Sequence, residues 1–143
     1  MIDSILLVDD EDLFHLVFED SCSLLDITLS LKSLNSADEA AKLFAEWQKD
    51  PTNRPECVFV DLNIIGSSFD GIELIRKINF EYGNHVVIGI ISSSNEPDEQ
   101  AKAVQAGAQF WIIKSDEIEP RLVDFKKDYE GFKNRTQAFK IYK

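Results

Sequence analysis

The sequence is poor in the residues that form zinc, thiol and nucleotide sites. Its 143 residues include two cysteines and two histidines, with no CxxC motif, no histidine pair at metal-binding spacing and no glycine-rich phosphate loop. Cys22 and Cys57 lie in apolar patterns, which favours buried thiols over a disulfide and fits a reducing cytoplasm. His15 and His85 are interpreted as ordinary helix and loop residues.

Long apolar stretches are also missing. No run approaches the roughly 20 apolar residues needed to span a bilayer. The first residues, Met-Ile-Asp-Ser, contain no basic segment leading into an apolar one. We therefore expect neither a transmembrane helix nor a secretory signal, and we place the protein in the cytoplasm. With 44% hydrophobic and 29% charged residues, the composition is that of one soluble globular domain.

Positive charge is scarce. The 15 Lys and Arg residues against 26 Asp and Glu residues give a net charge of −11. This balance argues against direct binding to nucleic acid, because phosphate recognition needs clustered basic side chains. The basic residues are unevenly placed, since residues 121–143 hold seven of them and three acidic ones. This segment is either a solvated C-terminal helix and tail or a docking surface for an acidic partner.

Short apolar runs alternate with helical patterns along the chain. Continuous runs of strand length cover residues 5–8, 57–60, 86–91 and 110–113. A weaker run at 28–34 alternates Leu29 and Leu31 with polar residues, as in a half-exposed edge strand. Five strands alternating with five helices predict one α/β domain with a parallel sheet. We expect this domain to cover residues 1–130, and residues 131–143 to form a C-terminal helix extension or tail.

Capping signals mark the helix ends. Ser36 with Glu39, and Asp70 with Glu73, have the spacing of a capping box and predict two helix starts. Gly107 is well placed as the C-terminal cap of the helix that precedes it.

Acidic residues follow the first apolar run directly. Asp9, Asp10, Glu11 and Asp12 repel one another unless something compensates their charge. They mark either an acidic helix start, since carboxylates favour the positive end of a helix dipole, or a cation site. The second interpretation requires groups from distant parts of the chain to converge on the same place.

Polar side chains also end the later apolar runs. Asp61 follows the third, Ser92 begins a serine triplet after the fourth, and Lys114 follows the fifth. In open parallel sheets, ligands gather at the carboxyl ends of the strands near the topological switch point. We therefore expect these groups to share one shallow pocket with Asp9 and Asp10.

Together these groups have the chemistry of covalent phosphoryl transfer. The carboxylates of Asp9, Asp10 and Asp61 are hard oxygen ligands that suit a Mg²⁺ ion keeping several waters. The Asp61 carboxylate can also act as a nucleophile that forms an acyl phosphate. Lys114 and the metal would then screen the phosphoryl charge, and Ser92 would donate a hydrogen bond to a phosphoryl oxygen.

Four motifs in order resemble the receiver domain of two-component response regulators, of the single-domain, chemotaxis-regulator type. They are LLVDDE at 6–11, VFVDLN at 58–63, DGIELI at 70–75 and SSSNEPDEQAKAVQAGAQFWIIK at 92–114. The resemblance covers about residues 3–130. It implies a flavodoxin-like, doubly wound sheet of five parallel strands in the order 2-1-3-4-5 with five helices.

The resemblance implies a role for each matching residue. Asp61 takes the position of the phosphoacceptor, and Lys114 that of the invariant lysine. Ser92 takes the position of the switch hydroxyl, with Ser93 as the alternative if the alignment shifts by one residue. Trp111 takes the position of the switch aromatic, with a static core aromatic as the competing interpretation. The metal ligands by position are Asp9, Asp10, Asp61 and the backbone carbonyl of Asn63.

Two features depart from the family pattern. Members usually carry a Met-Pro pair soon after the phosphoacceptor and a glycine eight positions beyond it, whereas this chain reads DLNIIGSSFDG and places Gly71 ten positions after Asp61. The loop is therefore two residues longer. Ser115 replaces a proline that members join to the lysine by a cis bond. A cis bond costs about 3 kcal/mol without proline and under about 1 kcal/mol with it, so we expect a trans bond after Lys114.

The sequence favours a single-domain response regulator of a phosphorelay. A sensor histidine kinase or phosphotransfer protein would transfer a phosphoryl group to Asp61 with Mg²⁺. The product would signal through contacts with a downstream protein, because no output domain follows. Such a protein catalyses only its own phosphorylation and dephosphorylation. We expect contact with neither nucleic acid nor a membrane.

Two alternatives remain. In a binding module that no longer uses phosphorylation, a pseudo-receiver, the altered loop and Ser115 would matter more, although the full acidic set argues against it. The other alternative is a phosphatase that acts through an aspartyl phosphate. Enzymes of that class tend to carry Asp-x-Asp at the nucleophile, where this chain has Asp61-Leu62-Asn63.

Overall fold

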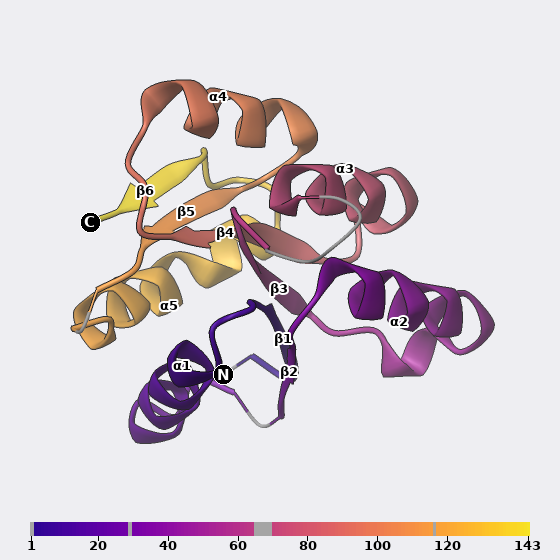
Figure 1. Cartoon of the computed structure of the whole chain (residues 1–143), viewed down its shortest axis with the longest axis horizontal. Helices are drawn as coiled ribbons and strands as arrows, with labels where there is room; N and C mark the ends of the chain where they lie inside the picture. Colours follow the sequence, from indigo (N-terminus) through magenta and orange to yellow (C-terminus); the bar gives the residue numbers. More distant parts are fainter. Residues whose placement is uncertain (1, 29, 65–69, 116) are drawn as a thin grey trace.

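The chain forms a parallel sheet with helices on both faces (Figure 1). The computed structural model describes residues 2–28, 30–64, 70–115 and 117–143. Within them the elements in chain order are β1 (Ile5–Val8), α1 (Asp12–Leu24), β2 (Leu31–Leu34), α2 (Ala37–Lys49), the 3₁₀ helix η1 (Pro51–Asn53), β3 (Cys57–Asp61), α3 (Gly71–Tyr82), β4 (Val87–Ser92), α4 (Pro97–Ala106), β5 (Phe110–Ile113), α5 (Glu119–Lys133) and β6 (Lys140–Tyr142). The strand order is β2-β1-β3-β4-β5-β6, so the predicted flavodoxin-like arrangement is confirmed and extended by one strand.

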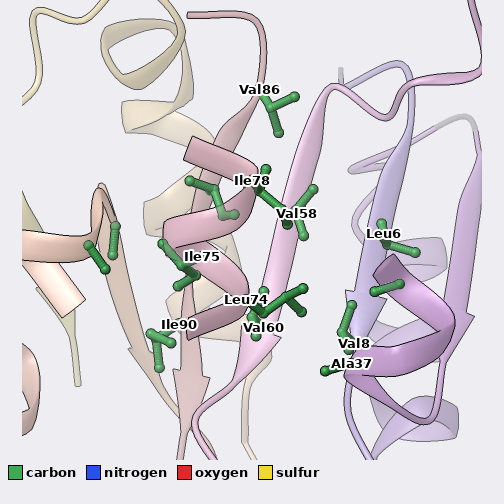
Figure 2. Packing of buried hydrophobic residues seen from close by; sticks show 14 of the residues in the cluster. Leu6, Val8, Ala37, Val58, Val60, Leu74, Ile75, Ile78, Val86 and Ile90 are labelled. Carbon is green, nitrogen blue, oxygen red and sulfur yellow. The ribbon is translucent and has the colours of Figure 1, made fainter. Parts of the chain in front are cut away.

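Apolar side chains on both faces of the strands hold the helices to the sheet. Val58 and Val60 point to the face that α3 covers (Figure 2), in a core cluster that also contains residues of α2 and α4. Phe59, between them, points to the other face, where α1 and α5 lie. Its ring centroid is 5.1 Å from that of Phe110 and 5.2 Å from that of Phe125. Successive residues of a strand face opposite sides, so strands covered on both faces have the continuous apolar runs seen in the sequence.

The predicted helix caps are confirmed. Ser36 Oγ accepts a hydrogen bond from the N–H of Glu39 at 3.1 Å, and Asp70 Oδ1 accepts one from the N–H of Glu73 at 2.9 Å. Gly107 ends α4 with a φ of 114°, a left-handed conformation that favours glycine. In the described part of the chain, no helix is long and apolar enough to span a membrane.

The predicted edge strand is β2. It pairs in parallel with β1, with Ile5 opposite Leu31, and its residues are half-buried or exposed. The structure thus confirms the strand over residues 31–34. Leu29, which belonged to the same predicted run, lies outside the described residues.

The C-terminus corrects the prediction of five strands followed by a helix extension or tail. α5 ends at Lys133, Arg135 turns the chain with a φ of 62°, and β6 then pairs in parallel with β5. Tyr142 is buried against Phe125, with 5.9 Å between ring centroids, and its hydroxyl donates to Asp128 Oδ2 at 2.6 Å. Three strand residues are too few to give a periodic pattern, so the packing that creates β6 is not visible in the sequence.

Basic residues of the C-terminal segment contact the rest of the chain. Lys126 Nζ donates to the carbonyls of Leu25 and Asp26, just after α1, at 3.2 and 3.4 Å. Lys133 forms an ion pair with Glu56, with 3.3 Å between nitrogen and oxygen. A cation at the C-terminal end of a helix also interacts favourably with the helix dipole. These contacts support a structural role for the positive charge, while docking of an acidic partner stays a prediction.

Candidate functional site

The carboxyl ends of neighbouring parallel strands bring the predicted groups together. Lys114 Nζ, after β5, lies 2.6 Å from Asp9 Oδ2, after β1, and 3.6 Å from Asp61 Oδ1, at the end of β3. The same ammonium lies 3.3 Å from Glu11 Oε1. Asp9, Asp61 and Ser92, the last residue of β4, are all buried. The strand order therefore explains how four segments distant in sequence supply one site.

Asp9 is fully buried and held on several sides. Its Oδ1 accepts a hydrogen bond from the N–H of Glu11 at 2.8 Å, and its own N–H donates to the carbonyl of Leu34 at 3.0 Å. Its Oδ2 faces Lys114. Asp12, by contrast, lies in the first turn of α1, where it complements the helix dipole. Asp12 therefore fits the interpretation of the acidic run as a helix start. Asp9, at the beginning of the run, instead faces Lys114 in the site.

Gly71 allows α3 to begin against the backbone of Asp61. Its N–H donates to the carbonyl of Leu62 at 3.1 Å. A Cβ at this position would overlap with the carbonyl oxygen of Asp61, so a larger residue would displace the end of β3. The predicted two-residue lengthening of the preceding loop involves residues 65–69, which lie outside the described residues.

Burial and like charges shift the pKa values of the site. Burial, and next the Asp9 carboxylate, raises the pKa of Asp61 to about 7. Burial also raises the pKa of Asp9, although the hydrogen bond to Lys114 opposes this shift. Burial disfavours the Lys114 ammonium, but contacts with Asp9 and Asp61 outweigh burial and raise its pKa. Several carboxylates around one ammonium leave an excess of negative charge that a bound cation would offset.

The side chains present fit a divalent cation. Carboxylate oxygens of Asp9, Glu11 and Asp61 all lie within 4.8 Å of one another, and such oxygens are the ligands that Mg²⁺ prefers. Asp9 and Asp61 are among the ligands predicted from the sequence, whereas Glu11 is not, because its only signal is its place in the acidic run. Asp10 is half-buried and outside this group of three, and Asn63 is exposed after β3. Their roles as ligands stay predictions.

Two hydrogen bonds link Ser92 to Trp111 through the backbone of Ser94. Ser92 Oγ accepts from the N–H of Ser94 at 3.1 Å, and the carbonyl of Ser94 accepts from Trp111 Nε1 at 3.0 Å. Ser93, the alternative hydroxyl, is exposed, which favours Ser92 as the inward-facing one. Trp111 is fully buried in the core under α2, α3 and α4, and Ile141 of β6 packs against the same core.

Sequence comparison identifies the family to which this site belongs. A family model described as the response regulator receiver domain matches residues 5–122. The chain belongs to this family. The matched range contains Asp9, Asp61, Ser92 and Lys114, so the resemblance indicated by the motifs is confirmed. A search of curated proteins found no match.

Solved structures of receiver domains share the fold. The receiver domain of NtrX from Brucella abortus is 26% identical, with a TM-score of 0.68 over 88% of this chain and 98% of that one. The phosphorylated cyanobacterial phytochrome response regulator RcpA is 19% identical, with a TM-score of 0.70 over 95% of this chain and 96% of that one. NtrX from Brucella abortus in complex with ADP is 22% identical, with a TM-score of 0.77 over 94% of this chain, which spans 29% of its length.

In this receiver domain, serine replaces proline after the site lysine without a cis bond. No described peptide bond is cis, so the bond between Lys114 and Ser115 is trans, as predicted. Ser115 Oγ accepts hydrogen bonds from the N–H of Glu117, at 3.2 Å, and from the guanidinium of Arg121. The serine therefore takes part in the connection between β5 and α5.

The metal-free receiver domain should lose stability as the pH rises from about 4 to about 7. The Asp61 carboxyl has a pKa of about 7 in the folded chain and of about 4 in the unfolded chain. The folded state therefore binds more protons in this interval, and the free energy of unfolding should fall by about 2–4 kcal/mol. Urea unfolding with a chelator at a series of pH values measures this change. Asp61→Asn should show a much smaller decrease, and an equal decrease would contradict the raised pKa.

Proposed function

We propose that this receiver domain accepts a phosphoryl group on Asp61 in a Mg²⁺-dependent reaction, as a response regulator of a cytoplasmic phosphorelay. The observation that carries this proposal is the position of the Lys114 ammonium, which is within ion-pair distance of both Asp9 and Asp61. A carboxylate nucleophile, a fixed cation and further carboxylates for a metal are the groups that phosphoryl transfer to a carboxylate requires.

In the proposed reaction, a carboxylate oxygen of Asp61 attacks the phosphorus of a phosphodonor. The new O–P bond forms as the bond from phosphorus to the nitrogen or oxygen of the donor breaks, and the leaving group keeps that electron pair. Lys114 Nζ, 3.6 Å from Asp61 Oδ1, is placed to contact an oxygen of the transferred group. Mg²⁺, held by the acidic group, would supply further positive charge next to the phosphoryl oxygens.

The nucleophile must be ionised before it can attack. With a pKa of about 7, a substantial fraction of Asp61 is protonated at neutral pH when no metal is bound. Lys114 lowers this pKa, and a cation among the carboxylates would lower it further. The same positive charge that stabilises the phosphoryl group therefore also favours the reactive form of Asp61.

Phosphorylation would reach the surface through Ser92 and Trp111. A phosphoryl oxygen on Asp61 would accept a hydrogen bond from the Ser92 hydroxyl and draw Ser92 Oγ away from the Ser94 N–H that now donates to it. Because the carbonyl of Ser94 holds the Trp111 indole, movement of this loop would change the position of Trp111 or of the residues around it. The altered surface would then be recognised by a downstream protein.

The surface around the site supports a protein as phosphodonor. Leu13 and Leu16 on α1 are 74% and 60% exposed. Next to them lies a groove of about 370 Å³, lined by Glu11, Leu13, Phe14, Val17, Ser93, Lys114 and Ser115. Exposed apolar side chains rimmed by polar ones are typical of protein-interaction sites. They support a sensor histidine kinase or phosphotransfer protein that docks here to reach Asp61.

A binding module that does not use phosphorylation is the second candidate. Full burial of Trp111 would favour this candidate if the ring kept its place after phosphorylation of Asp61, because an aromatic that does not move cannot report the change. We propose no activity on other substrates, since Asp61-Leu62-Asn63 lacks the second carboxylate of an aspartyl-phosphate phosphatase. The protein would catalyse only its own phosphorylation and dephosphorylation.

Incubation with acetyl phosphate and Mg²⁺ should add the mass of one phosphoryl group, measured by intact-protein mass spectrometry. Asp61→Asn should abolish the increase, because an amide cannot form an acyl phosphate. Asp124→Asn, which changes an exposed carboxylate on α5, serves as the matched control and should be labelled like the wild type. Undiminished labelling of Asp61→Asn would place the acceptor elsewhere, and an unlabelled wild type would favour the second candidate.

Beryllofluoride, a phosphoryl mimic, should change the emission of Trp111 when it is added with Mg²⁺ to a Trp47→Phe variant. Trp47 is itself buried, against Phe44 on α2, and would otherwise add a background signal. Replacing Ser92 with Ala should weaken the change, because the hydrogen-bonded link through the Ser94 backbone is then lost. Unaltered emission despite demonstrated beryllofluoride binding would mean that Trp111 is packed core and carries no signal.

A further inference from the structure

A histidine with no predicted role contacts the backbone of the acidic site. His15 Nε2 lies 2.5 Å from the carbonyl oxygen of Asp9. His15 is half-buried in the first part of α1, where its own N–H donates to the carbonyl of Glu11 at 3.2 Å. Side chains of a helix tilt toward its N-terminus, so the imidazole reaches back over the start of α1 to the end of β1.

The geometry determines which ring nitrogen carries a proton. A carbonyl oxygen only accepts hydrogen bonds, so Nε2 of His15 must be the donor in this contact. The imidazole is therefore either the neutral form protonated at Nε2 or the imidazolium. In both forms the Nε2–H group donates a hydrogen bond to the carbonyl oxygen of Asp9.

The contacted carbonyl belongs to the peptide unit that joins Asp9 to Asp10. The other polar groups of Asp9 are already held: the N–H by Leu34, Oδ1 by the N–H of Glu11 and Oδ2 by Lys114. A donor on the carbonyl fixes the orientation of the peptide plane, and with it the direction in which the Asp10 side chain leaves the backbone.

We propose that His15 is a positioning residue that orients the Asp9–Asp10 peptide for cation binding. The inference rests on the proposed function, because it concerns the Mg²⁺ on which phosphorylation would depend. His15 would not contact the metal. Its hydrogen bond would hold the Asp9–Asp10 peptide in place before the cation binds. The binding free energy would then not be reduced by the cost of ordering this peptide.

A positioning role for His15 and a role that only stabilises α1 predict different responses to Mg²⁺. A helix-stabilising residue would change the melting temperature equally with and without Mg²⁺. A positioning residue changes the concentration of Mg²⁺ at which the melting temperature rises, since that rise reports binding to the folded state.

The test follows the melting temperature of the full chain as Mg²⁺ is added. His15→Leu removes the donor at similar size and should weaken apparent Mg²⁺ affinity about fivefold, the value of one ordinary hydrogen bond. His15→Gln, whose amide can donate to the same carbonyl, should restore most of the affinity. His85→Leu is the matched control, because His85 is the second of two histidines and lies exposed before β4, and its Mg²⁺ response should equal that of the wild type.

Nitrogen-15 NMR of the imidazoles keeps the inference testable if His15→Leu does not fold. With two histidines in the chain, His85→Leu assigns the remaining signal to His15. The expected signal shows a proton on Nε2, protected from exchange. A neutral ring protonated on Nδ1 would overturn the inference, as would a folded His15→Leu with wild-type Mg²⁺ affinity. A wild type without any Mg²⁺ response would instead contradict the proposed function itself.

Discussion

The ion pairs of Lys114 with Asp9 and Asp61 are the interaction on which the rest of the site depends. They connect the ends of β1, β3 and β5, and they place a half-buried ammonium between carboxylates that would otherwise repel one another. Removing one partner of a buried charge pair leaves an uncompensated charge, which is strongly destabilising. The excess of carboxylates over cations at these strand ends is therefore a local source of destabilisation that a bound cation would relieve.

Much of the fold and part of the site could be predicted from residue patterns. Continuous apolar runs indicated strands covered on both faces, and Ser36, Asp70 and Gly107 marked helix ends through local hydrogen bonds or φ values. Asp61 and Lys114 could be placed together because parallel topology brings the carboxyl ends of the strands to one edge of the sheet. These features depend on local sequence and on a general rule of topology.

The features that were missed depend on tertiary packing. β6 is short, and it is held in place because Tyr142 packs against Phe125 and donates a hydrogen bond to Asp128 on α5. Glu11 turns toward Lys114, and His15 reaches back to the carbonyl of Asp9, through side-chain directions that helical periodicity does not specify. Which strand ends form the site could therefore be predicted from the sequence. The contacts of Glu11 and His15 within the site could be identified only from the structure.

The most direct test of the account is an NMR titration of the Asp61 carboxyl carbon in the metal-free protein and in Lys114→Met. The account predicts a pKa of about 7 in the wild type, because burial and Asp9 disfavour the carboxylate. It predicts a higher pKa in Lys114→Met, because Lys114 lowers the pKa of Asp61 in the intact site. An ordinary pKa near 4, unchanged by the loss of Lys114, would show that these groups do not form one coupled site.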